Sequence, residues 1–293
     1  MTPTNRKLLE MIKENKSIEY ICYALNISRK QLRQRIESIK KSGFRVERIY
    51  SPTNYDKLGI DYDSNSLTNK IINTCDIDNS IYIGLVADTH IGNELCDMDA
   101  IKYMYDFFAS KGINFVFHLG DLVEGDLINK YEDVESQIIS AISDYPKYDE
   151  LRNFIVFGNH DMSFVEKTGI DLSETIEYYR DDFISLGFDS AILRLQDCDI
   201  KLMHKSSNDN QSSLIIGGHV HKYIFYGDAG TPRIICPTLS KINKYDDYPS
   251  ALILKLVFNK NKICNFALFQ YIVLDKKVVK ASEFNYQYSK KKN

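Results

Sequence analysis

Three features are missing from this chain of 293 residues, and each absence narrows what the protein can be. No run approaches the roughly 18 uninterrupted apolar residues that a membrane-spanning helix needs, and the charged stretch 1–16 contains no apolar signal segment. The six cysteines show no Cys-x-x-Cys spacing, and most lie in apolar runs, so we expect reduced packing residues rather than disulfides or zinc ligands. These absences predict a cytoplasmic protein with no membrane partner.

Histidine is also scarce, and five of the six histidines fall inside short motifs that follow apolar runs. In chain order the motifs are Asp88-Thr89-His90, Gly120-Asp121, Gly158-Asn159-His160-Asp161, His204 and Gly218-His219-Val220-His221. Scattered core histidines would not collect in this way. Carboxylate, carboxamide and imidazole ligands together suit divalent ions such as Mn, Fe or Zn. The ordered set predicts a hydrolytic site with two metal ions.

The same five blocks resemble the signature of the calcineurin-like metallophosphoesterases, which runs Asp-x-His, Gly-Asp, Gly-Asn-His-Asp/Glu, His and Gly-His-x-His. The resemblance covers residues 80–275. It implies an α/β (α+β) fold in which two packed mixed β-sheets are flanked by helices. It also implies a metal-dependent hydrolase that acts on phosphate esters.

Details of the blocks point to one branch of that family. Gly-Asn-His-Asp is common in its nucleases and phosphodiesterases, whereas Gly-Asn-His-Glu and a later Asp-Arg-Gly mark its Ser/Thr protein phosphatases. This chain has Asp161 in the third block and Glu124-Gly125-Asp126 after the second. The resemblance therefore disfavours a protein phosphatase.

The resemblance also implies a role for each motif residue. The first metal would be held by Asp88, His90 and His221, and the second by Asn159, His204 and His219. Asp121 would bridge them, because cations about 3.5 to 4 Å apart repel unless an anion lies between them. The two divalent ions are expected to be Mn2+, with Fe or Zn as alternatives. His160 would protonate the leaving oxygen, and Asp161 would orient its imidazole.

The resemblance assigns no role to the polar residues that neighbour the motifs. Asn93, Glu94, Glu124 and Asp126 follow the first two motifs and could line the substrate entrance, but we interpret them as polar loop residues. His118 lies within an apolar run and is interpreted as a core histidine or a support for the ligands rather than a ligand itself.

Secondary structure is expected to alternate through the motif region. Strand-like apolar runs precede the motifs at 81–87, 115–119, 154–157, 200–203 and 214–216. The ligands would then lie just beyond the carboxyl ends of strands, where loops converge in α/β sheets. Helices are expected at 98–110 and 134–142, strands at 222–226 and 233–235, and a hairpin at 251–273 that turns at 259–261.

Charge divides the chain into two unlike parts. Residues 1–50 hold 12 Lys and Arg against 5 Glu, a net charge of +7, which leaves 25 basic and 35 acidic side chains elsewhere, a net charge of −10. This asymmetry suggests a segment that faces nucleic acid, joined to an acidic body. A solvated helical surface is the alternative.

Three short helices are predicted in the basic segment. Ser28 and Gln31 match a capping box that opens the third helix, and Leu32, Ile36 and Ile39 would face inward. The side chains left facing outward are Arg29, Lys30, Arg33 and Gln34. This pattern resembles helix-turn-helix domains, in which such residues contact bases and phosphates of DNA. Basic three-helix bundles that bind proteins are the alternative.

Four parts are expected along the chain. They are a helix-turn-helix-like DNA-binding domain at 1–50, a polar linker at 51–80, the phosphoesterase domain at 81–275 and a basic C-terminal tail at 276–293. We predict a two-metal phosphoesterase that hydrolyses phosphodiester bonds in nucleic acid. The alternatives are a phosphodiesterase or phosphatase for small nucleotides, and a DNA-binding regulator with a non-catalytic phosphoesterase domain. The complete set of motif residues disfavours the last.

Overall fold

The chain forms two compact units, shown in a computed structural model that describes residues 2–51, 56–61, 70–72, 79–125, 134–205, 211–227, 230–241 and 248–288. The smaller unit comprises Met1–Asp76 with Leu193–Gln196, and the larger comprises Ile77–Ile192 with Asp197–Asn293. Within these described ranges, no helix is long and apolar enough to cross a membrane, and no cysteine forms a disulfide.

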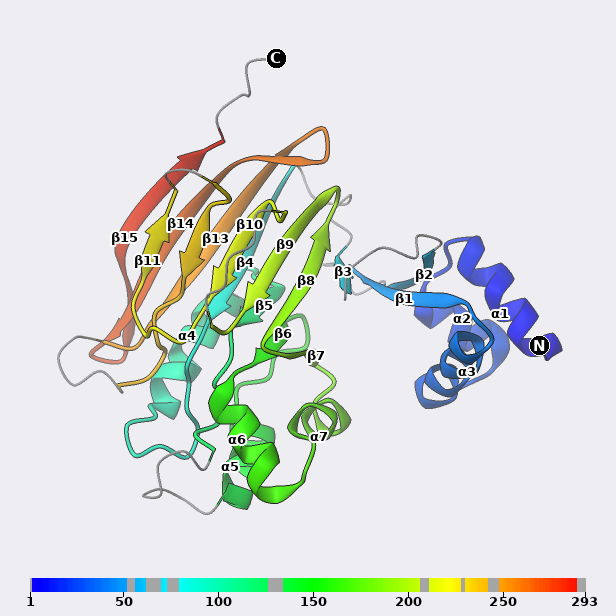
Figure 1. The fold of residues 1–293 in the computed structure, drawn as a ribbon, viewed down its shortest axis with the longest axis horizontal. Coiled ribbons are helices and arrows are strands. Elements are labelled where there is room, and N and C mark those ends of the chain that lie inside the picture. The colour runs from blue at the N-terminus through cyan, green and yellow to red at the C-terminus, as the bar shows by residue number, and fades with distance from the viewer. Residues whose placement is uncertain are drawn as a thin grey trace. The chain divides into compact units, whose positions relative to one another are not determined.

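Two β-sheets make up most of the larger unit (Figure 1). The first has the order β15-β14-β13-β4-β5-β6-β7, and its strands β4 to β7 are parallel. The second includes β11-β12-β10-β9-β8, and its strands β9, β10 and β12 are parallel. The strand bounds are β4 Ser80–Val86, β5 Phe115–His118, β6 Arg152–Phe157, β7 Phe183–Phe188, β8 Ser190–Leu195, β9 Cys198–Met203, β10 Leu214–Gly217, β11 Ile224–Tyr226, β12 Arg233–Ile235, β13 Ser250–Asn259, β14 Lys262–Leu274 and β15 Lys277–Gln287.

Four helices of the larger unit contribute side chains to the hydrophobic core beside the sheets. They are α4 Met98–Ser110, α5 Val134–Ser143, α6 Asn159–Thr168 and α7 Leu172–Tyr179. The Asp97 side chain caps α4 by accepting the backbone N–H of Ala100. Met104 and Phe108, four residues apart and therefore on one face of α4, are fully buried in the same core cluster as Val116 of β5. This arrangement confirms the predicted fold class.

The expected strands that precede the motifs are all present. They correspond to β4, β5, β6, β9 and β10, with differences of one or two residues at the ends. The predicted hairpin is β13 and β14, and the predicted helices are α4 and α5. Periodicity was sufficient here because both helices carry one apolar face and the strands are buried along most of their length.

Two segments differ from the expected division of the chain. The expected tail 276–293 instead contributes β15, which pairs with β14 along most of its length. Most side chains of β15 are exposed, but its backbone pairs with β14, and the Phe284 and Tyr286 rings pack against Phe225. The expected linker 51–80 contains two short strands, β2 Lys57–Asp61 and β3 Lys70–Ile72, while much of the rest of it lies outside the described residues.

The smaller unit consists of three helices followed by paired strands. Its helices are α1 Pro3–Lys13, α2 Ile18–Leu25 and α3 Arg29–Lys41, and β1 Arg45–Tyr50 pairs with β2 and β3. The capping box of Ser28 and Gln31 is present at the start of α3. Leu8, Ile21 and Ile39, one from each helix, are fully buried against one another. The predicted helices and their apolar faces are confirmed.

Candidate metal centre

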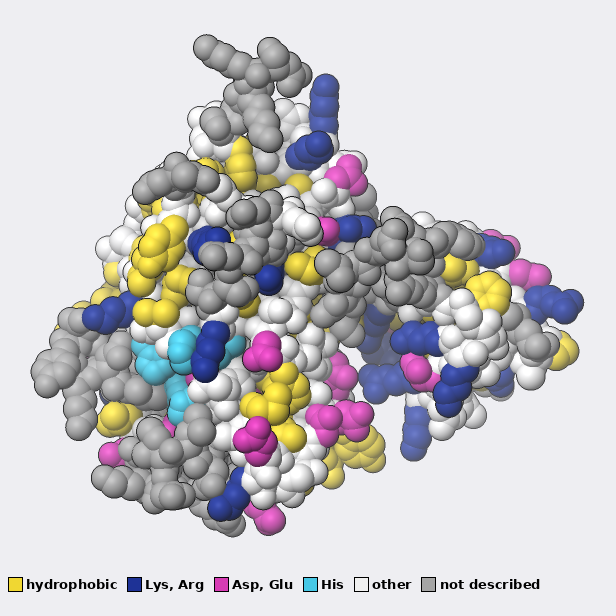
Figure 2. Space-filling model, viewed as in Figure 1, with side chains coloured by type: hydrophobic (Ala, Val, Ile, Leu, Met, Phe, Trp, Pro, Cys, Tyr) yellow, Lys and Arg dark blue, Asp and Glu magenta, His cyan; other side chains and the backbone are white. Residues whose placement is uncertain are grey.

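Motif side chains from both sheets converge at the carboxyl ends of their strands. Asp88 follows β4, Asp121 follows β5, Asn159 follows β6, and His204 follows β9 directly. The fifth motif, which supplies His219 and His221, follows β10. Figure 2 shows histidine side chains gathered together at the surface of the larger unit. Parallel strands bring these loops to one edge, as the sequence predicted.

Five of the seven expected ligands have a left-handed backbone. Their φ values lie between 48° and 70°, and they are Asp88, His90, Asp121, His219 and His221. Residues with a side chain adopt this conformation at a cost in free energy, and such costs concentrate at functional sites. The unusual backbone of these loops therefore indicates that they position the five side chains, in addition to connecting the strands to the elements that follow.

The first cluster contains Asp88, His90 and His221, whose ligand atoms lie within 4.8 Å of one another. His90 Nε2 is 3.3 Å from His221 Nε2, and His221 Nε2 is 3.5 Å from Asp88 Oδ1. Asp88 and His90 are buried, whereas the His221 side chain remains 18% exposed. The cluster thus has an open side at His221.

The second cluster contains Asp121, His204 and His219. His204 Nε2 lies 3.0 Å from Asp121 Oδ2 and 3.2 Å from His219 Nδ1. Asn159 joins this cluster, because its Oδ1 is 3.1 Å from His204 Nε2. The members are those expected from the sequence for the second metal.

Asp121 lies between the two clusters. Its Oδ2 is 3.0 Å from His204 Nε2 in the second and 3.8 Å from His90 Nε2 in the first. Its other oxygen, Oδ1, accepts the backbone N–H of His160 at 2.9 Å. One carboxylate oxygen is therefore within reach of both candidate metal positions.

Hydrogen bonds determine which nitrogens of the ligand rings carry lone pairs. His204 Nδ1 is 2.8 Å from the carbonyl oxygen of Leu119, and since a carbonyl only accepts, Nδ1 carries the proton and Nε2 of the neutral ring has a lone pair. His204 Nε2 faces Asp121 Oδ2 and Asn159 Oδ1, which are acceptors too. Acceptors this close repel unless a proton on Nε2 or a metal ion lies between them. The donor set of the second cluster therefore fits a divalent ion.

The first cluster shows the same arrangement. His90 Nδ1 is 2.8 Å from Glu124 Oε2, a carboxylate oxygen that can only accept, so the lone pair of the neutral His90 ring is on Nε2. That nitrogen faces His221 Nε2. Two imidazole nitrogens and the Asp88 carboxylate are the ligand types that Mn, Fe and Zn accept.

The electrostatics of the ring nitrogens also favour positive charge. Burial lowers the pKa of His204, but its hydrogen bond to Asp121 and the Asp121 charge outweigh burial and raise that pKa to about 9. Burial likewise opposes the charge on His90, yet Glu124, Asp121 and Asp88 raise its pKa. The carboxylates thus attract either protons or metal ions to the same nitrogens.

Two motif glycines leave room for the ligands. A Cβ added at Gly120, which has a φ of 94°, would lie 2.3 Å from His204 Nδ1. A Cβ at Gly158 would lie 2.3 Å from Asp121 Oδ1. Since both distances are far inside van der Waals contact, any larger residue at either position displaces a candidate ligand.

His160 lies next to the first cluster and forms a third group with His90 and Glu124, whose ligand atoms are within 4.8 Å of one another. Its Nδ1 donates to the backbone carbonyl of Glu124 at 2.7 Å, and its ring centroid is 4.6 Å from that of His90. The Nε2 atom is the nitrogen left for a substrate oxygen. The side chain is 16% exposed, so solvent and substrate have access to it.

Asp161 does not orient His160 as the sequence had suggested. Its buried carboxylate instead accepts the backbone N–H groups of Leu122, Val123 and Gly158, at 3.2, 3.0 and 2.8 Å. Burial and the Asp121 charge raise the pKa of Asp161 above its ordinary value, although these N–H bonds act in the opposite direction. Asp161 therefore joins the loop after β5 to the start of α6.

A comparison with protein families shows to which family the chain belongs. Residues 81–237, more than half of the chain, match the model for the calcineurin-like phosphoesterase superfamily domain. The chain belongs to this superfamily. The matched residues include all the candidate ligands, so the larger unit is a phosphoesterase unit. A comparison with curated protein sequences gave no match.

Several solved structures resemble the phosphoesterase unit at low sequence identity. Vacuolar protein sorting 29 from Cryptosporidium parvum is 16% identical, with a TM-score of 0.45 over 72% of this chain and 100% of that one. A novel archaeal phosphodiesterase is 15% identical, with a TM-score of 0.44 over 69% and 100%. The nuclease MPE of Pseudomonas putida is 14% identical, with a TM-score of 0.38 over 65% and 84%.

Glu124 belongs to the centre, although the sequence suggested only a polar loop residue. It is buried, its Oε2 accepts from the candidate ligand His90, and its backbone carbonyl accepts from His160. Among the described residues, its Oε1 has no hydrogen-bond partner. One residue thus sets the orientation of both rings. Its position three residues after Asp121 was the available signal, but only the fold brings it to His90.

His118 is buried in β5 and lies behind the ligands. Its Nε2 is 3.2 Å from Thr89 Oγ1, and burial lowers its pKa to about 3, with the positive charges of His204 and His90 acting in the same direction. A neutral core histidine agrees with the interpretation of the sequence. Asp126, interpreted earlier as a loop residue, lies outside the described residues.

We expect Glu124→Ala to weaken Mn2+ binding by about 10-fold to 100-fold, because outer hydrogen-bond partners of ligating histidines contribute that much to metal affinity. Glu124→Gln keeps a side-chain carbonyl for His90 Nδ1 and should lose less. Isothermal titration calorimetry with Mn2+ measures the affinities, with the exposed Glu150→Ala as the matched control. Equal affinities for Glu124→Ala and Glu150→Ala would contradict the positioning role.

Proposed function

We propose that this protein is a two-metal phosphodiesterase that acts on nucleic acid. The observation that supports the proposal is the position of Asp121 Oδ2, which is near one histidine of each ligand cluster. Two ions held about 3.5 to 4 Å apart need such a shared anion. The intact set of ligands and His160 also disfavours a regulator with a relic domain.

Each side chain of the centre has a separate task in the proposed reaction. Asp88, His90 and His221 would hold one ion, and Asn159, His204 and His219 would hold the other. The metal pair would supply charge stabilisation at the phosphoryl group and a nucleophile from water at neutral pH. His160 donates a proton from Nε2 to the leaving oxygen, because its Nδ1 is committed to the Glu124 carbonyl.

The smaller unit supports nucleic acid as the substrate. Figure 2 shows Lys and Arg side chains over its surface. On α3 the side chains of Lys30, Arg33 and Gln34 are exposed, as predicted, opposite the buried Leu32 and Ile39. We propose that α3 contacts DNA in the manner of a recognition helix.

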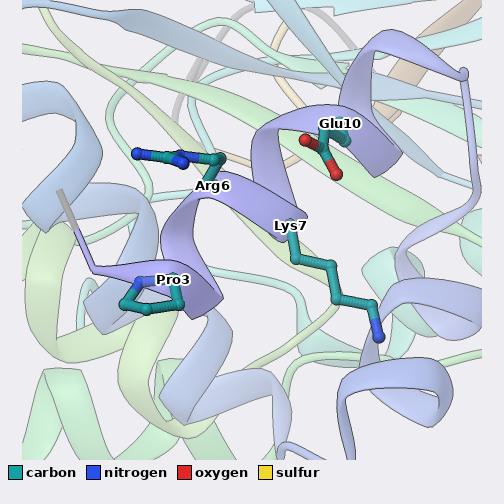
Figure 3. A pocket seen from close by; sticks show the side chains of 4 residues that line it. All are labelled: Pro3, Arg6, Lys7 and Glu10. Carbon is teal, nitrogen blue, oxygen red and sulfur yellow. The ribbon is translucent and has the colours of Figure 1, made fainter.

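Arg29 has a different environment from the other three predicted contact residues. Its guanidinium is 2.9 Å from Glu19 Oε1, so part of its charge is already neutralised within the unit. On α1, Arg6 and Lys7 line a hollow of about 330 Å³ together with Pro3 and Glu10 (Figure 3). Exposed basic side chains of this unit therefore lie on α1 as well as on α3, and Arg29 contributes less charge than its position suggests.

An activity panel tests the proposed function. Protein with Mn2+, Zn2+ or no added metal would be assayed on methyl p-nitrophenyl phosphate, p-nitrophenyl phosphate, cyclic nucleotides, and single- and double-stranded DNA. We expect metal-dependent hydrolysis of the diesters, including DNA, and little hydrolysis of the monoester. Hydrolysis of the monoester alone would contradict a phosphodiesterase, and hydrolysis of small diesters without DNA would contradict a nuclease.

Replacing Lys30 and Arg33 together by alanine in the full chain should weaken binding to duplex DNA. Each phosphate contact contributes about 0.9 to the slope of log affinity against log salt, so the slope should fall by about 1.8. Fluorescence anisotropy at several salt concentrations measures both quantities. The matched control replaces the exposed lysines Lys102 and Lys262 of the phosphoesterase unit. Equal slopes for the two double variants would contradict DNA contact by α3.

A further inference from the structure

A cavity of about 410 Å³ lies beside the open side of the first ligand cluster. His221, a candidate ligand, is part of its wall, so the cavity begins where the metal centre ends. The rest of the wall comes from β14, the start of β13 and the loops that flank β11 and β12. The described lining residues include Tyr223, Thr238, Ser240, Tyr248, Ser250 and Gln270.

Polar side chains in this wall are held in fixed orientations. Thr238 is 6% exposed, and its hydroxyl donates to the backbone carbonyl of Asp88 at 2.7 Å. Ser240, 2% exposed, is 2.9 Å from the Thr238 hydroxyl. The Thr238 hydroxyl also accepts the backbone N–H of Ser240 at 3.2 Å, so its hydrogen bonds are used within the wall. The wall is thereby tied to the backbone of a candidate ligand, and Ser240 and Gln270 supply the polar groups for a ligand.

Gln270 offers a donor and an acceptor at the same place. Its Nε2 donates to Ser250 Oγ at 3.1 Å, and its Oε1 accepts from Ser282 Oγ at 3.1 Å. A primary amide has two N–H groups and two oxygen lone pairs. The bond to Ser250 uses one N–H, and the bond from Ser282 uses one lone pair. The remaining N–H and lone pair match the donor and acceptor edges of a nucleobase or the hydroxyls of a sugar.

Two tyrosines add aromatic surface to the cavity. Tyr248 is 50% exposed, and Tyr223 is partly buried directly after the Gly218-to-His221 motif. Aromatic rings of this kind stack on nucleobases, whatever the base, because every base has a π-face. The cavity therefore combines a stacking surface with fixed polar groups, the usual composition of a site for a small organic ligand.

We propose that this cavity binds the nucleoside that stays attached to the phosphate when the leaving group departs. Its volume lies toward the lower end of the range of about 300 to 1,000 Å³ for small-ligand sites, which suits one nucleoside rather than a stack of bases. The inference rests on the proposed phosphodiesterase activity and adds its substrate class, an ester with one nucleoside beside the scissile bond.

A pair of substrates isolates the contribution of the nucleoside. Thymidine 5′-p-nitrophenyl phosphate and methyl p-nitrophenyl phosphate are both diesters with the same leaving group. In each, water adds to phosphorus and the bond to p-nitrophenolate breaks, which leaves thymidine 5′-phosphate or methyl phosphate. We expect kcat/KM for the thymidine ester to exceed that for the methyl ester by at least about tenfold, since stacking of one base is worth this much.

Variants then locate the contribution. Tyr223→Ala and Gln270→Leu should each lower the ratio of the two kcat/KM values by about tenfold, mainly through a higher KM for the thymidine ester. Tyr226→Ala is the matched control, because Tyr226 is an exposed tyrosine on β11 that is not among the described lining residues. An unchanged ratio in both cavity variants, or an equal loss in Tyr226→Ala, would overturn the proposal.

Inhibition distinguishes the source of the nucleoside. If thymidine 5′-phosphate inhibits hydrolysis of the thymidine ester in wild type and less in Tyr223→Ala, the cavity accepts free nucleotides. If a short oligothymidylate shows the same pattern of inhibition at a lower concentration than thymidine 5′-phosphate, the cavity accepts the end of a strand. Inhibition by neither would contradict the nucleoside site. Hydrolysis of both p-nitrophenyl esters at equal rates overturns this inference alone, whereas hydrolysis of neither overturns the proposed function.

Discussion

Asp121→Asn is expected to lower the metal content from about two ions per chain to fewer than one, because the substitution removes the charge of the carboxylate that the two clusters share. Turnover of a diester should fall by about a thousandfold or more, since the metal pair contributes several kcal/mol to the stabilisation of the transition state. Metal analysis after equilibration with Mn2+ and steady-state kinetics measure the two effects.

The fold should survive this change. Asparagine keeps an oxygen that can accept the backbone N–H of His160, as Asp121 Oδ1 does now. Asp149→Asn makes the same charge change at an exposed loop position and serves as the matched control. If Asp121→Asn retained two ions and wild-type turnover, Asp121 would not be the shared ligand.

His160→Ala is expected to leave metal content near the wild-type value and to lower turnover by about a hundredfold to ten-thousandfold on substrates with poor leaving groups. The reason is that His160 lies outside the two clusters that Asp121 joins, although it forms a third group with His90 and Glu124. Its Nδ1 bonds to the Glu124 carbonyl, which leaves Nε2 for the leaving oxygen. Thymidylyl-thymidine, whose leaving alkoxide needs a proton, shows this loss in an assay of released thymidine.

The leaving group provides the internal control for this variant. Methyl p-nitrophenyl phosphate releases p-nitrophenolate, which departs without a proton, so His160→Ala should affect its turnover much less than that of thymidylyl-thymidine. An equal loss on both substrates would show that His160 does not act as the acid. A parallel loss of metal would instead assign His160 to the ligand set, because the ring of His90 lies against it.

Much of the ligand set could be predicted from the sequence because its signals are local. Each ligand follows a buried strand, so an apolar run and the polar residue after it mark both the strand and the loop. The resemblance then supplied the grouping, and the distances bring together the same sets, including Asn159 with His204. The capping box of Ser28 and Gln31 likewise marked the start of α3 from four residues alone.

Features that depend on distant contacts could not be predicted in this way. Glu124 faces His90, which is 34 residues earlier in the chain, and nothing in its local sequence distinguishes it from a loop residue. Asp161 accepts N–H groups from a loop 38 and 39 residues away. Most side chains of β15 are exposed, and only its residues 283–287 alternate between exposed and half-buried, so the strand shows chiefly in its backbone pairing with β14.

The charge pattern shows the same limit in the smaller unit. Spacing predicted that Arg29, Lys30, Arg33 and Gln34 face outward on α3, and all four are exposed. Spacing did not predict that Glu19 of α2 pairs with Arg29, because that contact depends on how two helices pack. If this unit binds DNA as proposed, Lys30 and Arg33 would make more of the phosphate contacts than Arg29.

A titration of metal-free protein with Mn2+, with bound ions and hydrolysis of methyl p-nitrophenyl phosphate measured in the same sample, tests the two-metal centre most directly. We predict saturation at about two ions per chain, with most of the activity appearing as the second position fills. Full activity at one bound ion per chain, or hydrolysis that persists after metal removal by a chelator, would contradict the account.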